Sequence, residues 1–210
     1  MLKLYYSPGS CALASHIALA DANAAYQAIR VDFASGEQTK PDFLTINPKG
    51  RVPALVTDEG TLTETPAILA FIAQRFHNAD LAPLNDPFAF AQVQEFNSYL
   101  CSTVHVNHAH RSRGKRWADD PAAIAEMQRK VPETVFQAFE LVEKEYLKGP
   151  WVFGTDYTIS DAYLYTVARW LERDGINPTE QLPRVAEHRA RMEARDVVKA
   201  VVEEHFAGTH

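Results

Sequence analysis

Short apolar segments separated by turn residues make up the first part of the chain. Residues 2–6 form an apolar and aromatic run that stops at Ser-Pro-Gly-Ser, which is typical of a strand followed by a loop. Leu13, Ile17 and Ala20 then recur at helical spacing. Apolar and polar side chains alternate over residues 26–33 and predict a second strand. Together these elements predict a β-α-β unit whose two strands lie parallel.

A proline near the start of the next apolar run, residues 52–56, indicates an unusual strand entrance. Proline counts against a central strand, so Pro53 fits better as a cis-proline that leaves the backbone N–H and C=O of Val52 for another partner. Residues 58–60 carry a hairpin turn signal, and residues 61–63 form the returning strand.

Glu64-Thr65-Pro66 is the clearest helix start in the sequence. Thr65 is a candidate N-cap, and Pro66 fits the first helical position, where its missing N–H has no cost. The amides of such a helix start bind anions, and Glu64 is placed to meet a cation beside the anion. A carboxylate next to an ammonium, as at the end of a free amino acid, would satisfy both groups.

The rest of the chain is helical in character. Residues 78–87 contain two prolines and no helical period, and longer helical patterns follow at about 88–105 and 122–146. Thr158 and Asp161 are spaced as a capping box, which we interpret as a structural feature of the second domain.

A cysteine stands where the first helix is expected to begin. A helix start stabilises thiolate over thiol, so Cys11 is predicted to have a lowered pKa and a functional thiol, although a lone cysteine is more often a small buried hydrophobe. Ser10 is the alternative, because a hydroxyl beside the helix start can donate to a bound thiolate. Cys101 lies inside an amphipathic helix and is expected to pack in the core, while His16 has no predicted chemical role.

Composition narrows the class of protein. The chain has 210 residues, a formal net charge of −6 and two cysteines, which argues against nucleic acid as the main partner and against a disulfide framework. Its start does not resemble a signal peptide, and no apolar run reaches membrane-spanning length. We therefore expect a cytoplasmic protein with no membrane partner.

A histidine cluster, His105, His108 and His110, precedes a basic run at residues 111–116. A metal site is possible on the face shared by His105 and His108, but no carboxylate or cysteine completes it at ligand spacing. The simplest alternative is a solvated helix end, where cations are favourable.

The element order β-α-β-(α)-β-β-α, the Ser-Pro-Gly-Ser-Cys turn, Asn-Pro-Lys-Gly-Arg-Val-Pro-Ala-Leu, and Glu-Thr before a helix resemble the glutathione S-transferase family, most closely its bacterial beta class. The resemblance implies an α/β plus all-α fold: a thioredoxin-like domain with a mixed four-stranded sheet at residues 1–77, a linker at 78–87, and an all-helical domain at 88–210. It also implies a homodimer that acts in detoxification. Glutathione would be the co-substrate, with no other cofactor and no metal, and the second substrate would be a small electrophilic or hydrophobic molecule.

The same resemblance assigns roles to residues of the first domain. Cys11 matches the cysteine that meets the glutathione sulfur. Val52, next to Pro53, matches the residue whose backbone pairs with the cysteinyl part of the tripeptide. Glu64 and Thr65 match the pair that holds the γ-glutamyl end.

On the helical side, His105 matches a histidine that lines the site near the ligand sulfur. Beta-class proteins usually follow it with a lysine, whereas this chain has Val106, so His108 or Arg111 could supply the missing cation. A lysine that the class often carries after the second strand is also absent from residues 34–37, which predicts weaker anion recognition there.

Two other functions remain open. A thiol-disulfide oxidoreductase with two cysteines needs Cys-x-x-Cys, but Cys11 is followed by Ala-Leu-Ala14, so only a monothiol route through a Cys11-glutathione disulfide is possible. A non-catalytic binding module is expected to lose the ligand anchors, which this chain keeps. Tyr6 is a third candidate for the catalytic group, because other classes of the family use a tyrosine on this strand.

Overall fold

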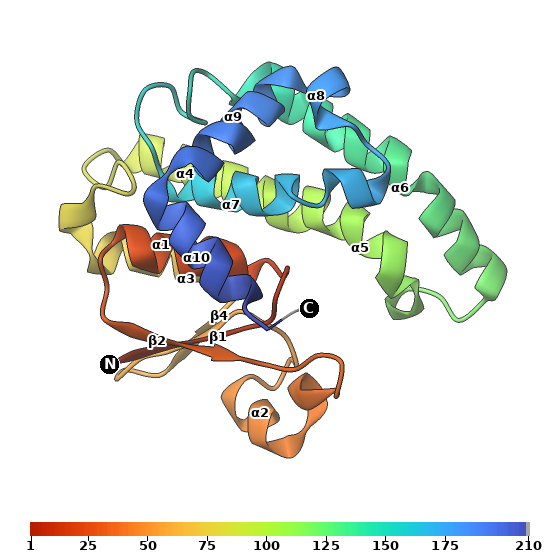
Figure 1. The fold of residues 1–210 in the computed structure, drawn as a ribbon, viewed down its shortest axis with the longest axis horizontal. Coiled ribbons are helices and arrows are strands. Elements are labelled where there is room, and N and C mark those ends of the chain that lie inside the picture. The colour runs from red at the N-terminus through yellow and green to blue at the C-terminus, as the bar shows by residue number, and fades with distance from the viewer. Residues whose placement is uncertain (209–210) are drawn as a thin grey trace.

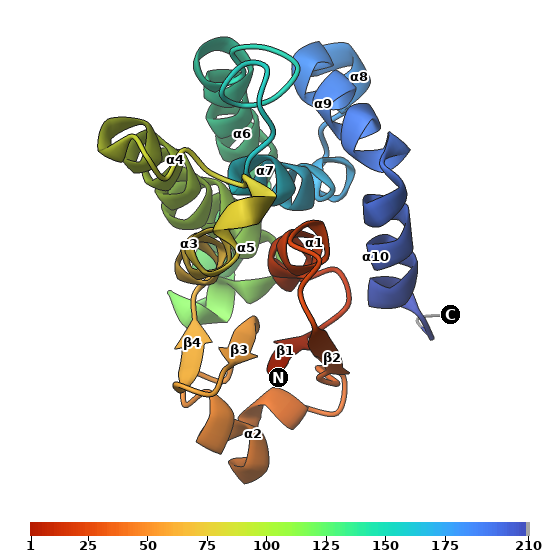
Figure 2. The ribbon, with the colours of Figure 1, turned by 90° about the vertical axis from the view of Figure 1, so that its left-hand side faces the viewer.

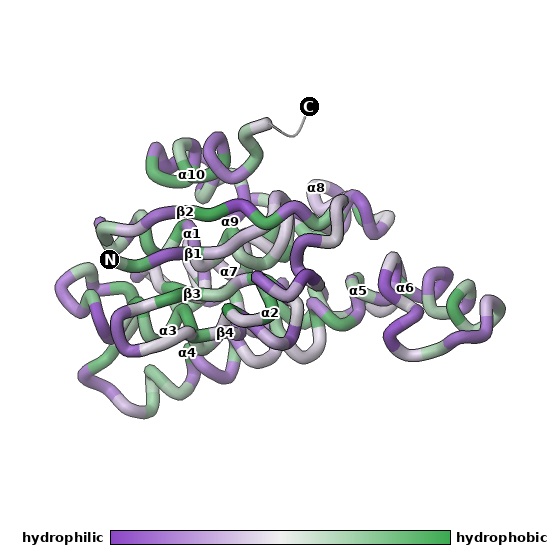
Figure 3. The backbone as a smooth tube through the Cα atoms, turned by 90° about the horizontal axis from the view of Figure 1, so that it is seen from below, coloured by the Kyte–Doolittle hydropathy of each residue, from purple (hydrophilic) through white to green (hydrophobic). Residues whose placement is uncertain are grey.

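The computed structural model describes residues 1–208 and contains a mixed four-stranded sheet in its N-terminal part (Figure 1). The strands are β1 (Leu2–Tyr6), β2 (Tyr26–Arg30), β3 (Ala54–Val56) and β4 (Thr61–Thr63), in the order β2-β1-β3-β4. β1 and β2 are parallel, and the other two pairs are antiparallel. The tube view from below shows the four strands side by side in this order (Figure 3). The mixed sheet expected for a thioredoxin-like domain is confirmed.

Helices cover both faces of this sheet (Figure 2). α1 (Ala12–Asp21) and α3 (Thr65–Arg75) lie on one face, and the short α2 (Pro41–Ile46) lies on the other. Paired residues Leu4 and Leu55 are fully buried, whereas the neighbouring Tyr5 packs its ring edge-on against Phe43 of α2 at 6.0 Å. This alternation is the period of two expected for a strand with different neighbours on its two faces.

The remaining helices form the second domain (Figure 1). They are α4 (Pro87–Tyr99), α5 (His105–Arg113), α6 (Pro121–Leu141), α7 (Ile159–Ala168), α8 (Pro178–Gln181), α9 (Pro183–Ala194) and α10 (Asp196–Phe206). A π-helical turn, Leu100–Val104, joins α4 to α5, and a second one, Val142–Tyr146, extends α6. Within residues 1–208, none of the helices has the length and apolarity that crossing a membrane requires.

The first helix of this domain is longer than the sequence pattern indicated. We expected it to end near His105, but the backbone continues in helical geometry through α5 to Arg113. The polar residues of α5 weaken the hydrophobic period without breaking the helix, because packing against α6 supplies its stability. The predicted helix at 122–146 matches α6 with its π-helical extension.

One apolar core crosses from the first domain into the second. It contains Leu4 and Leu69 from the sheet domain together with Phe96 and Leu164 from the helical domain. The last helix, α10, turns back to pack on α1 (Figure 2). The segment between the end of α3 and the start of α4 contains a short 3₁₀ turn, His77–Ala79.

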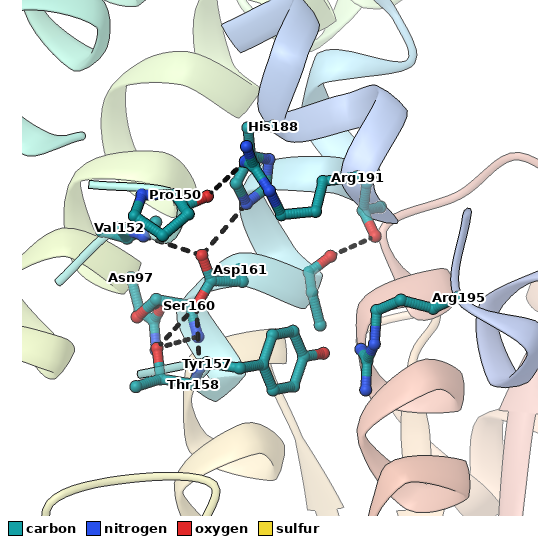
Figure 4. A network of polar contacts seen from close by, with 12 residues as sticks. Asn97, Pro150, Val152, Tyr157, Thr158, Ser160, Asp161, His188, Arg191 and Arg195 are labelled. Carbon is teal, nitrogen blue, oxygen red and sulfur yellow. Dashed lines mark hydrogen bonds and ion pairs between the residues drawn. The ribbon is translucent and has the colours of Figure 1, made fainter. Parts of the chain in front are cut away.

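The predicted capping box is present at the start of α7 and is part of a larger buried network (Figure 4). The carboxylate of Asp161 accepts hydrogen bonds from the backbone N–H groups of Thr158 and Val152, both at 2.8 Å, and lies 3.0 Å from Nε2 of His188 on α9. Asp161 is fully buried. It therefore ties α7, α9 and the preceding loop together, which is a structural role.

Candidate active site

A cleft of about 760 Å³ opens where the sheet domain meets the helical domain. The sheet domain contributes the loop before α1, the turn before β3 and the start of α3 to its lining. The helical domain contributes the π-helical turn between α4 and α5, α5 itself and the turn that follows it. It also contributes α7 and the turn after that helix. The residues assigned by the sequence, Ser10, Cys11, Val52, Pro53, Glu64, Thr65 and His105, all line this cleft.

Cys11 lies at the N-cap of α1, as the strand-to-helix turn indicated. Its Sγ is 3.7 Å from the carbonyl oxygen of Val52, and only 9 % of the residue is exposed. Burial raises the pKa of the Cys11 thiol, while a hydrogen bond with Thr65 and the charge of Arg113 act in the opposite direction. The expectation of a lowered pKa is therefore wrong, because the desolvation of the thiolate outweighs the stabilising groups around it.

The hydroxyl of Ser10 is engaged within the loop. Its Oγ donates to the carbonyl of Ser7 at 2.6 Å and accepts from the N–H of Ala12 at 3.4 Å. These contacts shape the turn that presents Cys11.

Tyr6 points away from the cleft. Its hydroxyl donates to the carbonyl of Glu204 at 3.5 Å, and its ring lies 4.6 Å from that of His205 on α10. It is absent from the residues that line the cleft. This location disfavours Tyr6 as the catalytic group.

The peptide bond between Val52 and Pro53 is cis, as expected. The preceding turn is held by Asn47, whose Nδ2 donates to the carbonyl of Arg51 at 2.7 Å. The turn therefore fixes the position at which the Val52 backbone faces the cleft.

The start of α3 differs by one residue from the sequence prediction. Thr65 is the first residue of the helix rather than its N-cap, and Glu64 occupies the N-cap position with a φ of 71°. This left-handed backbone conformation is strained for a residue with a side chain, and such strain concentrates at functional sites. The Glu64 carboxylate already holds a cation, because Nζ of Lys49 donates to it at 2.5 Å.

His105 stands in the helical wall of the cleft, edge-on to Trp170 at 5.1 Å between ring centroids. Burial, followed by the charge of Arg113, lowers the pKa of His105 to about 4, so the imidazole is neutral near pH 7. Val106 also lines the cleft. Arg113 is near enough to affect both Cys11 and His105, and it places positive charge at a site where the usual lysine is missing.

His108 and Arg111 are held by a buried carboxylate. Nδ1 of His108 lies 2.7 Å from Asp174, and Nε of Arg111 lies 3.1 Å from it. The His108 ring stacks on Trp170 at 4.3 Å, and the indole of Trp170 donates to the carbonyl of Gly9 at 3.1 Å. The network therefore anchors the loop before Cys11 to the helical domain. Sequence reasoning missed Trp170 and Asp174, because neither belongs to a local motif.

Cys101 packs against the apolar core as expected, but it has a second environment that the sequence did not indicate. It is only half-buried and lines the same cleft as Cys11, because the π-helical turn in which it lies faces the site. His16, by contrast, lies outside the cleft and is fully buried against His205. Within residues 1–208, the structure contains no cluster of three or more His, Cys, Asp or Glu side chains that could hold a metal ion.

A thioredoxin-like domain with a helix-start cysteine, joined to a helical domain across a cleft, defines the class of glutathione-transferase-like proteins. Residues 1–74 match the family model of the glutathione S-transferase N-terminal domain, and residues 115–191 match that of its C-terminal domain. A glutathione S-transferase from Escherichia coli O157:H7 is 32% identical over 202 residues, which cover 94% of this chain and 96% of that protein. The chain belongs to the glutathione S-transferase family.

Solved structures agree with this assignment. A glutathione transferase homologue from Sulfitobacter with bound glutathione is 44% identical, with a TM-score of 0.93 over 97% of this chain and 98% of that one. A beta-class glutathione S-transferase from Sphingomonas chungbukensis is 33% identical, with a TM-score of 0.84 over 97% of this chain and 98% of that one. The resemblance to the beta class therefore extends over nearly the whole fold.

Proposed function

We propose that this protein is a glutathione transferase that binds glutathione in the cleft, stabilises its thiolate and transfers it to a small electrophile. One observation supports this proposal above the others: the cleft brings together the Cys11 helix start, the Val52 backbone and the start of α3. These three features correspond to the sulfur, the peptide backbone and the amino-acid end of one extended tripeptide. Glutathione is then the co-substrate, with no other cofactor and no metal.

In the proposed complex, the tripeptide pairs with the backbone of Val52 in the manner of an added strand. The backbone N–H of Thr65, the first residue of α3, donates to the γ-glutamyl carboxylate. Glu64 receives the ammonium, and its two oxygens have the capacity to bind this group beside Lys49.

The proposed mechanism uses neutral donors and one cation. Since the raised pKa of Cys11 keeps it protonated, its S–H donates a hydrogen bond to the glutathione thiolate, as it does to Val52 in the structure. The neutral His105 donates a ring N–H, and Arg113 contributes its charge. The thiolate then attacks an electrophilic carbon, a sulfur–carbon bond forms, and the leaving group departs with its bonding electrons.

Adduct formation and turnover test this function together. Wild type, Cys11→Ala and the control Cys101→Ala are incubated with oxidised glutathione, analysed by intact mass, and assayed with glutathione and 1-chloro-2,4-dinitrobenzene. We expect a glutathione adduct on wild type and on the Cys101 variant but not on the Cys11 variant, and turnover that falls in the Cys11 variant. Unchanged turnover in that variant would move the thiolate-stabilising role to Ser10 or His105.

The same assays separate the two alternative functions. An adduct on Cys11 without aryl halide turnover would favour a monothiol disulfide reductase. Retention on immobilised glutathione without either reaction would favour a non-catalytic binding module.

We also propose that the protein is a cytoplasmic homodimer that acts in detoxification, without a nucleic-acid or membrane partner. The formal net charge of −6 supports the absence of a nucleic-acid partner. Multi-angle light scattering would measure the mass directly, and a monomer at micromolar concentration would contradict the dimer.

A further inference from the structure

The side chains that line the cleft carry net positive charge, although the chain as a whole is acidic. The formal net charge of the protein is −6, yet Glu64 is the only carboxylate among the described residues that line the cleft. The lining includes these arginines: Arg51, Arg111, Arg113, Arg116 and Arg173. Like charges in one concave site repel each other, so such an arrangement is retained where an anion offsets it.

Most of these arginines have no ionic partner within the described residues. Arg111 is paired with Asp174, and Glu64 is paired with Lys49. Within residues 1–208, none of the other arginines that line the cleft forms an ion pair: Arg51, Arg113, Arg116 and Arg173. Partial burial, followed by the charges of Arg113 and Arg51, lowers the pKa of Arg116. The three guanidinium groups therefore repel one another.

Glutathione would satisfy only part of this charge. In the proposed binding mode, one of its carboxylates lies at the start of α3, and its ammonium lies at Glu64. The glycine carboxylate lies at the other end of the tripeptide and takes one cation, for which Arg51, next to Val52, is the nearest in sequence. Arg116 then remains without an anion on the helical wall, where the second substrate would bind, beside Arg113, whose charge also favours the thiolate.

The same wall offers an aromatic surface. Trp117 follows Arg116 directly, lines the cleft and is 46% exposed, with its ring 4.4 Å from that of His110. A large aromatic side chain that remains exposed in a ligand cleft is typical of a binding surface for a flat apolar group. Arginine next to it favours a carboxylate on that group, because the guanidinium matches carboxylate geometry.

We infer that the second substrate is an aromatic or similarly flat electrophile that carries a carboxylate, which Arg116 and Arg113 bind while Trp117 contacts the ring. This inference rests on the proposed transferase function and adds the substrate class. With a fluoronitrobenzoate as the electrophile, the glutathione thiol first loses its proton to solvent. The thiolate then forms a sulfur–carbon bond at the ring carbon that carries fluorine, and the nitro-substituted ring holds the electron pair. Fluoride finally leaves with the electrons of the carbon–fluorine bond.

A matched pair of electrophiles tests the inference. 4-Fluoro-3-nitrobenzoate and 4-fluoro-3-nitrobenzamide differ in charge but little in shape, and each kcat/KM is divided by the rate of the uncatalysed reaction with glutathione. We expect the wild type to prefer the carboxylate by at least about tenfold, a discrimination of about 1.4 kcal/mol. Arg116→Gln should bring this ratio close to one. The control Lys115→Gln should keep the wild-type ratio, because this neighbouring exposed cation does not line the cleft.

The outcomes distinguish this inference from the proposed function. Turnover of both electrophiles with a wild-type ratio near one would overturn the inference and leave the transferase function standing. A ratio that Arg116→Gln does not change would also overturn the assigned site. If neither electrophile reacts and the protein is not retained on immobilised glutathione, the transferase function fails and the inference fails with it.

Discussion

At the scale of single residues, two opposing effects act on the thiol of Cys11. The helix start, Thr65 and Arg113 favour the thiolate, whereas burial favours the thiol. A residue with 9 % of its surface exposed loses most of the hydration that a thiolate would have in water, so the second effect dominates.

The reactivity of Cys11 should therefore increase with pH throughout the range near neutrality. In a Cys101→Ala background, which leaves one thiol, we expect the rate of carboxamidomethylation by iodoacetamide to rise continuously from pH 6.5 to pH 9, as measured by intact mass. A plateau below pH 7.5 would show that the helix start lowers the pKa after all. The model thiol N-acetylcysteine provides the reference for intrinsic reactivity.

His105 should have little influence on the pH profile of the enzyme. Its pKa of about 4 means that it is neutral on both sides of pH 6.5, where an ordinary histidine changes charge. We expect His105→Asn to lower kcat/KM for an aryl halide about tenfold without changing the shape of the pH profile. A step near pH 6.5 in wild type that disappears in the variant would contradict the neutral imidazole.

At the scale of secondary structure, the sequence predicted elements whose signals are local. β1, β4 and α3 were identified by their apolar runs and by turn or cap residues. Local signals were insufficient for α2, which has six residues, and for α5, whose surface is polar. Helices of this kind depend on tertiary packing, which a hydrophobic period does not report.

Asp161 contributes more to stability than a helix cap alone, because it also bonds groups outside its own helix. Asp161→Ala removes the acceptor for two backbone N–H groups and for His188, all of them buried, so we expect a loss of roughly 3 kcal/mol in the free energy of unfolding. Urea denaturation measures this loss. Asp156→Ala, an exposed carboxylate of the same loop, is the control and should change the stability little. Retention on immobilised glutathione by the folded fraction should persist, and its loss would contradict a purely structural role.

The junction between α1 and α10 should be sensitive to acid. Nδ1 of His16 lies 3.3 Å from Nδ1 of His205, and both side chains are buried beside Tyr6, with Glu204 and Arg169 as the nearby charged groups. Burial, followed by the charge of His16, lowers the pKa of His205 from 6.5 to about 3, and burial also lowers the pKa of His16.

These lowered pKa values set the direction of the pH dependence. Above pH 6.5 both histidines are neutral in the folded and unfolded states. As the pH falls below 6.5, only the unfolded chain takes up protons, so stability is lost progressively towards pH 3. For His205 alone we expect a loss of roughly 2 kcal/mol at pH 4.5 relative to pH 7. Urea denaturation at both pH values should show a smaller difference for His205→Gln than for wild type, while the exposed control His77→Gln should retain the full difference.

At the scale of the whole molecule, the sequence predicted the half of the site that lies in continuous segments. Cys11, Val52 and Thr65 were found because each stands in a recognisable turn or helix start. Trp170 and the cleft-lining arginines of the helical domain face them from the other side of the cleft. The hydrogen bond from Trp170 to Gly9 joins residues that are 161 positions apart. No local pattern contains such a pairing, so it becomes visible only in the folded structure.

The shared core predicts that the two domains unfold together. Leu69 of the sheet domain and Phe96 of the helical domain belong to one buried cluster, and α10 packs back on α1, so separating the domains would expose apolar surface on both. The chain offers an independent probe for each domain. Its three tryptophans all lie in the helical domain, and in a Cys101→Ala background the only thiol, Cys11, lies in the sheet domain. We expect tryptophan fluorescence and the accessibility of Cys11 to a thiol reagent to change with the same urea midpoint. Exposure of Cys11 at a clearly lower urea concentration would show that the sheet domain unfolds by itself and that the shared core does not couple the two.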